Sequence, residues 1–231
     1  MRFLKRCFLR LFLLLLVAVL AYQLWIFGHV IYWNTYNPST TAFMRDRLSE
    51  LRQKNPAATL RMRWMPYERI SHDLKRAVIA AEDGKFPDHD GFDFDAIQKA
   101  YQKNLQRGRL VAGGSTISQQ LAKNLFLSGA KTPWRKLQEA VVTFMLEKVM
   151  SKRRILEIYL NVIEWGNGVF GAEAATRYYY GVSASTLTTE QSARLAAMIP
   201  NPRFYDVNRS TPWLLKKTRI IQSRMPSATV P

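Results

Sequence analysis

Apolar residues form one long block near the start of the chain and short helical stripes after it. The block runs from Leu11 to Phe27, is interrupted only by Gln23, and extends weakly to Trp33. About 20 apolar residues are needed to cross a hydrocarbon core of about 30 Å. Because the block is apolar on all sides, it does not fit a helix that packs one face on a small core. We therefore expect residues 11–33 to form a transmembrane anchor.

Charges on the two sides of this block predict its orientation. Four basic residues precede it, namely Arg2, Lys5, Arg6 and Arg10, and no Lys or Arg follows until Arg45. By the positive-inside rule, residues 1–10 stay in the cytoplasm and the remainder is exported. A cleaved signal peptide is the alternative, since Val19-Leu20-Ala21 resembles a cleavage site. The apolar run continues past Ala21, which favours an anchor that is retained.

Beyond the anchor, the pattern is that of helices rather than strands. Residues 34–65 are expected to be a juxtamembrane linker, with a short basic helix from about residue 45 and an extended stretch near 61–66. Apolar residues then recur at helical spacing, and few runs alternate with period two. Polar residues suited to cap helices precede the stripes: Asp93, Ser115 or Thr116, Thr132, Thr188 and Thr211. The sequence predicts a mainly α domain over residues 66–225 and a tail over 226–231.

Composition limits the kinds of partner. The 231 residues are 48% hydrophobic, enough for a core, and 34 basic against 17 acidic residues give a net charge of +17. Such a charge favours anionic lipids, phosphorylated substrates or nucleic acid. No motif that reads a nucleic-acid groove is present, and the predicted export argues against nucleic acid as a partner. Cys7 is the only cysteine, so no intrachain disulfide can form.

The first candidate for chemistry is Glu82, in the segment EDGKFPDHDG at residues 82–91. It follows an apolar helical stripe and precedes a turn, where a carboxylate can face a cleft and act as a general acid or base. Taken by itself, a Glu-Asp pair at this place is more often a solvated helix end, and a lone His89 is more often a surface residue.

A second candidate is the segment GGSTISQQLAKN at residues 113–124. Glycines allow close approach of a ligand to the backbone, and the free N–H groups of a helix start attract anions. Thr116, Gln120 and Lys123 share one helix face, although an ordinary capped helix would show the same pattern. In RKLQE, Arg135, Lys136 and Glu139 also share a face. They form either a surface ion-pair set or a carboxylate held among cations that contact a diphosphate.

These segments, together with SKRRILEIYLN at 151–161, resemble the motifs of glycosyltransferase family 51, the peptidoglycan glycosyltransferases, in order and in approximate spacing. The resemblance covers most of residues 66–205. The short chain with one anchor is similar to the monofunctional biosynthetic members from Gram-negative bacteria. Ser128 and Lys131 match the S-x-x-K motif of transpeptidase domains, but too few residues follow them, and we interpret that match as chance.

The resemblance implies a lysozyme-like α fold of two lobes that polymerises lipid II into β-1,4-linked glycan strands at the inner membrane, on its periplasmic side, and is inhibited by moenomycin. Glu82 would be the catalytic base and Glu139 the second essential carboxylate. The positions that match the substrate cleft are Asp83, Phe86, His89, Ser115, Thr116, Gln120, Lys123, Arg135 and Lys136. No tightly bound metal is expected, and Mg²⁺ or another divalent cation bridging Glu139 and the diphosphate is left open. Partners would be lipid II, the growing strand, membrane lipids and other cell-wall synthesis proteins.

Two other functions fit parts of the pattern. A lytic transglycosylase shares the fold and one essential glutamate but cleaves glycan, and it has no need for cations around a diphosphate. A catalytically silent, membrane-tethered scaffold of the cell-wall machinery would use the basic surface only for adhesion. Lys123, Arg135 and Lys136 favour synthesis over cleavage, whereas the scaffold hypothesis predicts binding without turnover.

Overall fold

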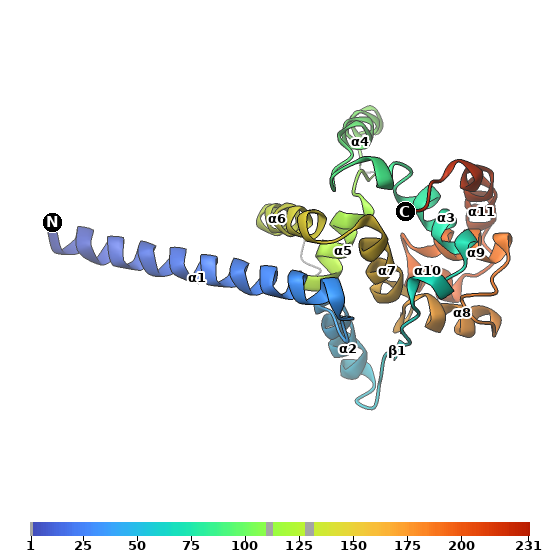
Figure 1. Cartoon of the computed structure of the whole chain (residues 1–231), viewed down its shortest axis with the longest axis horizontal. Coiled ribbons are helices and arrows are strands. Elements are labelled where there is room, and N and C mark those ends of the chain that lie inside the picture. The colour runs from blue at the N-terminus through green and yellow to red at the C-terminus, as the bar shows by residue number, and fades with distance from the viewer. Residues whose placement is uncertain (1, 110–112, 128–131) are drawn as a thin grey trace.

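The computed structural model describes residues 2–109, 113–127 and 132–231, and shows a long N-terminal helix that leads into a helical domain (Figure 1). The N-terminal elements are α1 (Arg2–Thr35), α2 (Ala42–Lys54), β1 (Arg61–Met62), η1 (Tyr67–Arg69), α3 (His72–Glu82), η2 (Phe86–Asp88), α4 (Phe94–Arg107) and α5 (Ile117–Phe126). The C-terminal elements are α6 (Pro133–Val149), α7 (Lys152–Val162), β2 (Glu164–Gly166), β3 (Val169–Phe170), α8 (Ala172–Tyr180), α9 (Thr189–Met198), α10 (Pro202–Val207), α11 (Pro212–Arg224) and η3 (Met225–Ser227). The prediction of a mainly α protein is confirmed. The segment Ser128 to Lys131 lies outside the described residues.

Local capping explains where several of these helices begin. Asp93, Thr132 and Thr211 each accept a hydrogen bond from the backbone N–H three residues ahead. Thr116 and Thr188 form capping boxes with Gln119 and Gln191. Each cap satisfies a donor that the helix itself leaves free. The predicted caps are therefore correct, and Thr116 rather than Ser115 starts α5.

A small sheet was not predicted. Its strand order is β1-β3-β2, with β1 parallel to β3 and β2 antiparallel to it. Strands of two or three residues are too short to show an alternating pattern, and we interpreted Gly166 and Gly168 only as chain breaks. The sheet joins the end of the linker, which contains β1, to the segment that follows α7. The short helix α10 was also not predicted.

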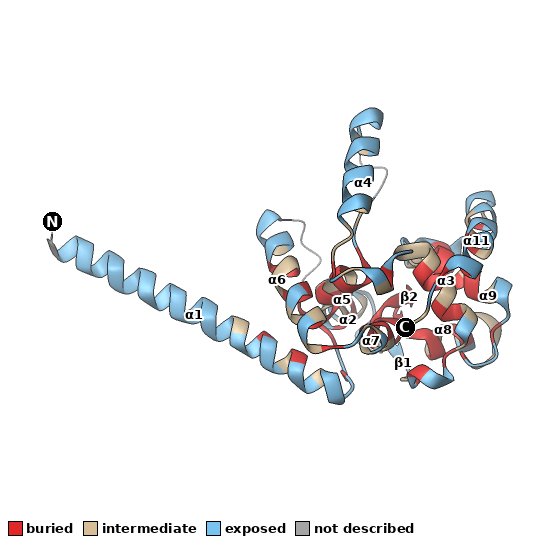
Figure 2. Ribbon diagram, turned by 45° about the horizontal axis from the view of Figure 1, so that its top comes forward, coloured by how far each residue is buried: buried red, intermediate tan, exposed pale blue. Residues whose placement is uncertain are grey.

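The core lies where α3, α5, α7, α9 and α11 meet, whereas α1 and α4 extend from it with mostly exposed surfaces (Figure 2). The largest side chains that are fully buried in it are Trp165, Tyr159 and Phe86. The last residues also pack on this body, since Ala228 is buried and the Tyr67 hydroxyl donates a 2.5 Å hydrogen bond to the carbonyl of Pro231.

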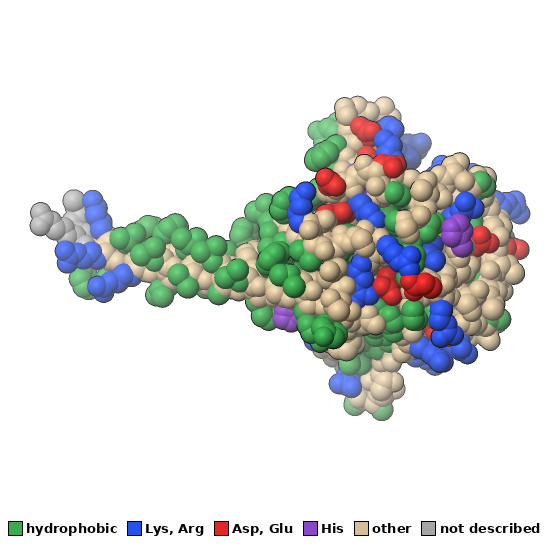
Figure 3. Space-filling view, in the orientation of Figure 1, with side chains coloured by type: hydrophobic (Ala, Val, Ile, Leu, Met, Phe, Trp, Pro, Cys, Tyr) green, Lys and Arg blue, Asp and Glu red, His purple; other side chains and the backbone are tan. Residues whose placement is uncertain are grey.

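Helix α1 is long and apolar enough to cross a membrane over Phe3–Thr35, with a mean hydropathy of 2.4. Its apolar surface is continuous in the space-filling view, and basic side chains gather at its free end (Figure 3). At the other end Ile26 and Val30 are fully buried against the domain. The anchor is therefore packed against the domain at this end rather than joined to it only by a flexible linker.

Candidate active site

Glu82 is the last residue of α3, and its side chain faces α5. The Gln120 side-chain amide donates a hydrogen bond of 2.8 Å to Oε2 of Glu82. The buried hydroxyl of Tyr159 on α7 in turn donates to Oε1 of Gln120 at 2.9 Å. Three helices thus fix the orientation of this carboxylate.

The surroundings of Glu82 make it a better base than a free carboxylate. Burial raises the pKa of Glu82, while the Gln120 hydrogen bond and the charges of Lys217 and Lys123 act in the opposite direction. A carboxyl with a raised pKa holds a proton more firmly, and the surrounding cations keep its ionised form accessible. This balance suits a group that must take a proton near neutral pH.

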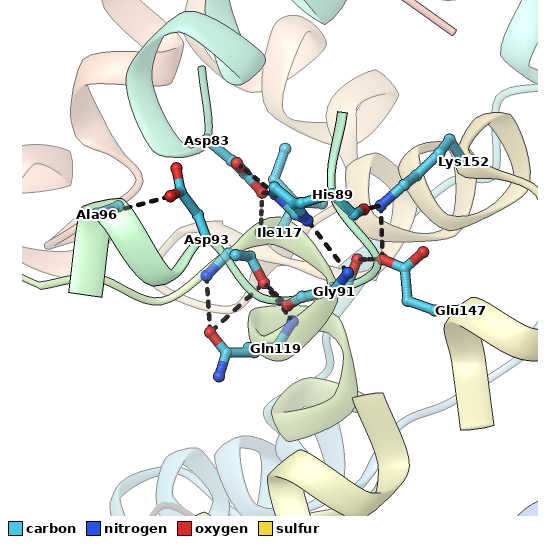
Figure 4. A network of polar contacts seen from close by, with 11 residues as sticks. Asp83, His89, Gly91, Asp93, Ala96, Ile117, Gln119, Glu147 and Lys152 are labelled. Atoms are coloured by element: carbon cyan, nitrogen blue, oxygen red, sulfur yellow. Dashed lines mark hydrogen bonds and ion pairs between the residues drawn. The ribbon is translucent and has the colours of Figure 1, made fainter. Parts of the chain in front are cut away.

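Asp83, next to Glu82, bonds to two neighbouring segments of the chain (Figure 4). Its buried carboxylate accepts hydrogen bonds from His89 Nε2 at 2.9 Å and from the backbone N–H of Ile117, also at 2.9 Å. The Thr116 hydroxyl donates to the carbonyl of Gly91 at 2.7 Å. These bonds fasten the start of α5 to the loop after α3, so Glu82 and Gln120 are held in one frame.

A second layer supports the same loop from the other side. Lys152 pairs with Glu147 at 2.7 Å, donates to the carbonyl of His89, and lies 4.7 Å from the ring centre of Phe86. Phe86 is fully buried. Of the predicted cleft residues, Phe86 is fully buried beneath the site and His89 is partly exposed, whereas Asp83 and Thr116 are buried but still line a cavity of about 350 Å³ that Glu82 also lines.

The glycine pair before α5 has a structural reason. A Cβ atom on Gly114 would lie 2.8 Å from Cα of Ile97. The backbone of this segment therefore passes directly against α4, which only a glycine allows. We expected these glycines to serve ligand approach, and the structure gives Gly114 a packing role in addition.

Glu139 on α6 forms the second charged centre. It is buried, accepts a hydrogen bond of 2.8 Å from Nη1 of Arg135, and forms a close ion pair with Lys136. Lys136 also reaches the exposed Ser115 hydroxyl at 3.4 Å. Lys123 is half-buried nearby; burial lowers its pKa, and the charge of Glu139 opposes that shift. A buried carboxylate is thereby surrounded by three cations.

These two centres face the same cavity. A space of about 270 Å³ is lined by Glu82, Ser115, Gln119, Gln120, Lys123, Glu139, Ile199 and Pro200. A second cavity of about 350 Å³ adjoins it through Glu82 and Ser115, and a third of about 210 Å³ adjoins it through Gln120 and Lys123. Glu82 therefore stands between two spaces that could each hold a sugar, beside a third that is rich in polar groups.

Two residues of this site were not predicted. Lys217 on α11 is half-buried, its pKa is lowered by burial, and its charge acts on Glu82. Tyr159 lies in the motif SKRRILEIYLN, but the sequence predicted no role for this tyrosine. No spacing in the sequence joins α11 to α3, so only their packing in the fold reveals Lys217.

The described side chains do not hold a ready-made metal site. No group of three or more His, Cys, Asp or Glu side chains comes together among residues 2–109, 113–127 and 132–231. Glu139 is the carboxylate closest to the cations, and both of its oxygens already accept from Arg135 and Lys136. A divalent cation at this place would need most of its ligands from a substrate.

The fold and the site together define a helical enzyme whose N-terminal helix is long and apolar enough to cross a membrane, with one carboxylate whose pKa is raised by burial and a second carboxylate held among cations. The family model described as Transglycosylase matches residues 49–226, and the chain belongs to this family. A biosynthetic peptidoglycan transglycosylase of Nitrosospira multiformis is 70% identical over 99% of this chain and 100% of its own length. Proteins with the same name from Methylobacillus flagellatus and Chromobacterium violaceum are 65% and 61% identical, over 98% and 94% of this chain and 99% and 95% of their own lengths. The resemblance inferred from the motifs is thereby confirmed.

Proposed function

We propose that this protein is the peptidoglycan glycosyltransferase that its relatives are named for, and that it polymerises lipid II into β-1,4-linked glycan strands. The observation that carries this proposal is one cavity that Glu82, Lys123 and Glu139 all line, with Arg135 and Lys136 paired to Glu139. This arrangement supports a base and a cation set for a diphosphate that act on one bound substrate.

Glu82 acts as the general base in this proposal. The acceptor is lipid II, whose GlcNAc 4-hydroxyl gives its proton to Glu82 as the oxygen attacks C1 of the MurNAc at the end of the growing strand. The new C–O bond forms on the face opposite the leaving group, so an α linkage becomes β in one displacement with inversion. The donor's undecaprenyl diphosphate leaves with the electron pair of the broken C1–O bond.

The cations stabilise that leaving group. A diphosphate needs less protonation than a sugar alkoxide, so fixed positive charge can replace a general acid. Lys123, Arg135 and Lys136 supply this charge, and the exposed hydroxyl of Ser115 lies beside Lys136. Glu139 holds the two α6 cations in place and limits their mutual repulsion.

We propose no resident cofactor. A divalent cation such as Mg²⁺ would bind with the substrate, between the diphosphate and Glu139, because the protein offers a single carboxylate there. Such a cation would supply additional positive charge to the leaving group.

The anchor serves the same reaction. Both substrates carry polyprenyl tails and stay in the bilayer, so tethering the enzyme there raises the effective concentration of each. The basic N-terminus and the apolar α1 support an inner-membrane protein with a cytoplasmic N-terminus and a periplasmic domain. Other cell-wall synthesis proteins are the expected protein partners, and nucleic acid is not expected.

The test is polymerisation of labelled lipid II by the purified full-length protein in detergent, with Glu82→Gln and moenomycin in parallel. We expect lysozyme-digestible polymer from the wild type, none from the variant, and none with moenomycin. The variant should still bind lipid II. Polymer formation by Glu82→Gln at the wild-type rate would show that Glu82 is not the base.

The two rival functions give different results. Release of fragments from isolated sacculi without any polymer would indicate a lytic enzyme. Binding of lipid II without turnover by a folded wild-type protein would indicate a scaffold.

A further inference from the structure

A separate cavity lies between the membrane helix α1 and helix α6. Its volume is about 480 Å³, within the range of about 300–1,000 Å³ that is typical of ligand pockets. Val19 and Tyr22 line it from α1, Trp134 and Arg135 from α6, and Phe126 from the end of α5. The lining is thus largely apolar and aromatic, and one wall belongs to the helix that crosses the membrane.

The two walls are held together by a reciprocal amide pair. Gln23 Nε2 donates to Gln138 Oε1 at 2.7 Å, and Gln138 Nε2 donates to Gln23 Oε1 at 3.1 Å. An unpaired amide in a membrane-spanning segment is costly, so this pair gives a physical reason for the polar residue within the apolar run. The Gln23–Gln138 pair fixes the distance between α1 and α6. The cavity beside this pair is therefore a preformed groove.

Arg135 joins this groove to the catalytic cavity. Its Nη1 is bonded to Glu139, which lines the cavity of Glu82, while the Arg135 side chain also lines the groove. Its Nε atom is buried and has no hydrogen-bond partner among the described residues. A buried cationic donor that lacks an acceptor marks a place where an anionic oxygen of a ligand would be stabilised.

We propose that the α1–α6 groove binds the first isoprene units of the lipid-diphosphate substrate, with Arg135 at the point where the tail meets the diphosphate. This inference rests on the proposed function and adds to it a site for the lipid part of the substrate. The anchor then has a second role, since it forms half of a binding site as well as holding the enzyme in the membrane.

The position of the groove favours the substrate tail over a membrane phospholipid. A phospholipid separates its phosphate from its acyl chains by a glycerol with two ester groups, whereas a polyprenyl diphosphate joins the apolar chain directly to the phosphate. Arg135 is the one charged residue among the described residues that line the groove. The polar lining residues Gln23 and Gln138 bond to each other and Thr132 caps α6, so these side chains are already engaged and the groove offers mainly an apolar wall and Arg135 to a ligand.

The experiment measures binding and turnover of two substrates by the full-length protein in nanodiscs. One is lipid II with its full polyprenyl chain, and the other carries a short prenyl chain. The variant Val19→Trp fills the groove. Val17→Trp is the matched control, since Val17 lies on the same helix but does not line the groove and is exposed. Binding of the corresponding polyprenyl diphosphates, without a sugar, is measured separately from turnover.

We expect Val19→Trp to reduce the preference for the long chain by about tenfold, in binding and in kcat/KM, and Val17→Trp to leave it unchanged. If the melting temperature of Val19→Trp falls, Trp134→Ala, which removes one wall, should reduce the preference in the same way. An equal loss of binding and of kcat/KM with both chain lengths, or no loss with either, would overturn the proposal that the groove binds the substrate tail.

Two further outcomes separate the alternatives. If the effect of Val19→Trp depends on the phospholipid composition of the nanodisc and not on the length of the substrate chain, the groove binds a membrane lipid and the proposal is overturned. A chain-length preference in binding that Val19→Trp reduces, without polymerisation by the wild type, would support the groove and overturn the proposed function.

Discussion

The side-chain amide of Gln120 donates a 2.8 Å hydrogen bond to Glu82 and accepts one of 2.9 Å from the Tyr159 hydroxyl. Tyr159 fixes which end of the amide faces which partner. Burial raises the pKa of Tyr159 well above its usual value, so its hydroxyl stays protonated and remains a donor. The NH₂ end of Gln120 is therefore held toward Glu82, where it favours the ionised carboxylate that a base requires.

Replacing Gln120 by Leu should reduce the fraction of Glu82 that is ionised near neutral pH. The Gln120 hydrogen bond lowers the pKa of Glu82, so its loss raises that pKa. Glu82 must be deprotonated to act, and the acidic limb of the kcat/KM profile should therefore move to higher pH. Near neutral pH we expect a loss of about tenfold, the size of one lost hydrogen bond to a charged group. Tyr159→Phe, which leaves the bond to Glu82 in place, should move the limb less. An unchanged profile for Gln120→Leu would contradict this role.

Lys217 offers a second way to move the same pKa. Its positive charge lowers the pKa of Glu82, so Lys217→Met should shift the acidic limb upward, and Lys217→Arg should restore it. Lys216 is the control, because it is exposed on the same helix. The measurement is the pH dependence of kcat/KM for each variant. Equal profiles for Lys217→Met and Lys216→Met would remove Lys217 from the site.

These two predictions show what the sequence could and could not provide. Gln120 and Lys123 could be placed on one face of a helix, because helical spacing determines neighbours within a helix. The distance from Gln120 to Glu82 depends on how α3 and α5 pack. The resemblance to a family assigned both residues to one active site but predicted no bond between them, and the residues by themselves indicated only two separate segments.

The residues around Asp83 show a different limit. A carboxylate, a histidine and a phenylalanine close to a catalytic glutamate looked like parts of a binding surface. In the fold, Asp83 and His89 bond to each other and Phe86 lies in the core. Sequence spacing locates such residues near a site, whereas the burial of Phe86 and the bond between Asp83 and His89 follow only from the packing of the fold.

Asp83 should accordingly matter for stability as well as activity. Asp83→Ala leaves the buried N–H of Ile117 without its acceptor and His89 without its partner. A buried donor without a partner costs about 1–3 kcal/mol, so we expect the melting temperature to fall by roughly 5 °C. Asp88→Ala, at an exposed position in the same loop, is the control. Loss of activity with an unchanged melting temperature would instead make Asp83 a direct substrate contact.

Removal of divalent cations provides a test of how the diphosphate is stabilised. Both oxygens of Glu139 accept from cationic side chains, and no cluster of three metal-ligating side chains occurs in the part of the chain that the structure describes. A metal that binds only with substrate cannot stabilise the free protein by linkage. Chelation by EDTA should therefore leave the melting temperature of the free protein unchanged. Turnover should fall after chelation and recover when Mg²⁺ is added together with lipid II, because the ion would supplement the positive charge of Lys123, Arg135 and Lys136. A lower melting temperature after chelation, reversed by a metal in the absence of substrate, would reveal a resident metal and require a ligand set other than Glu139.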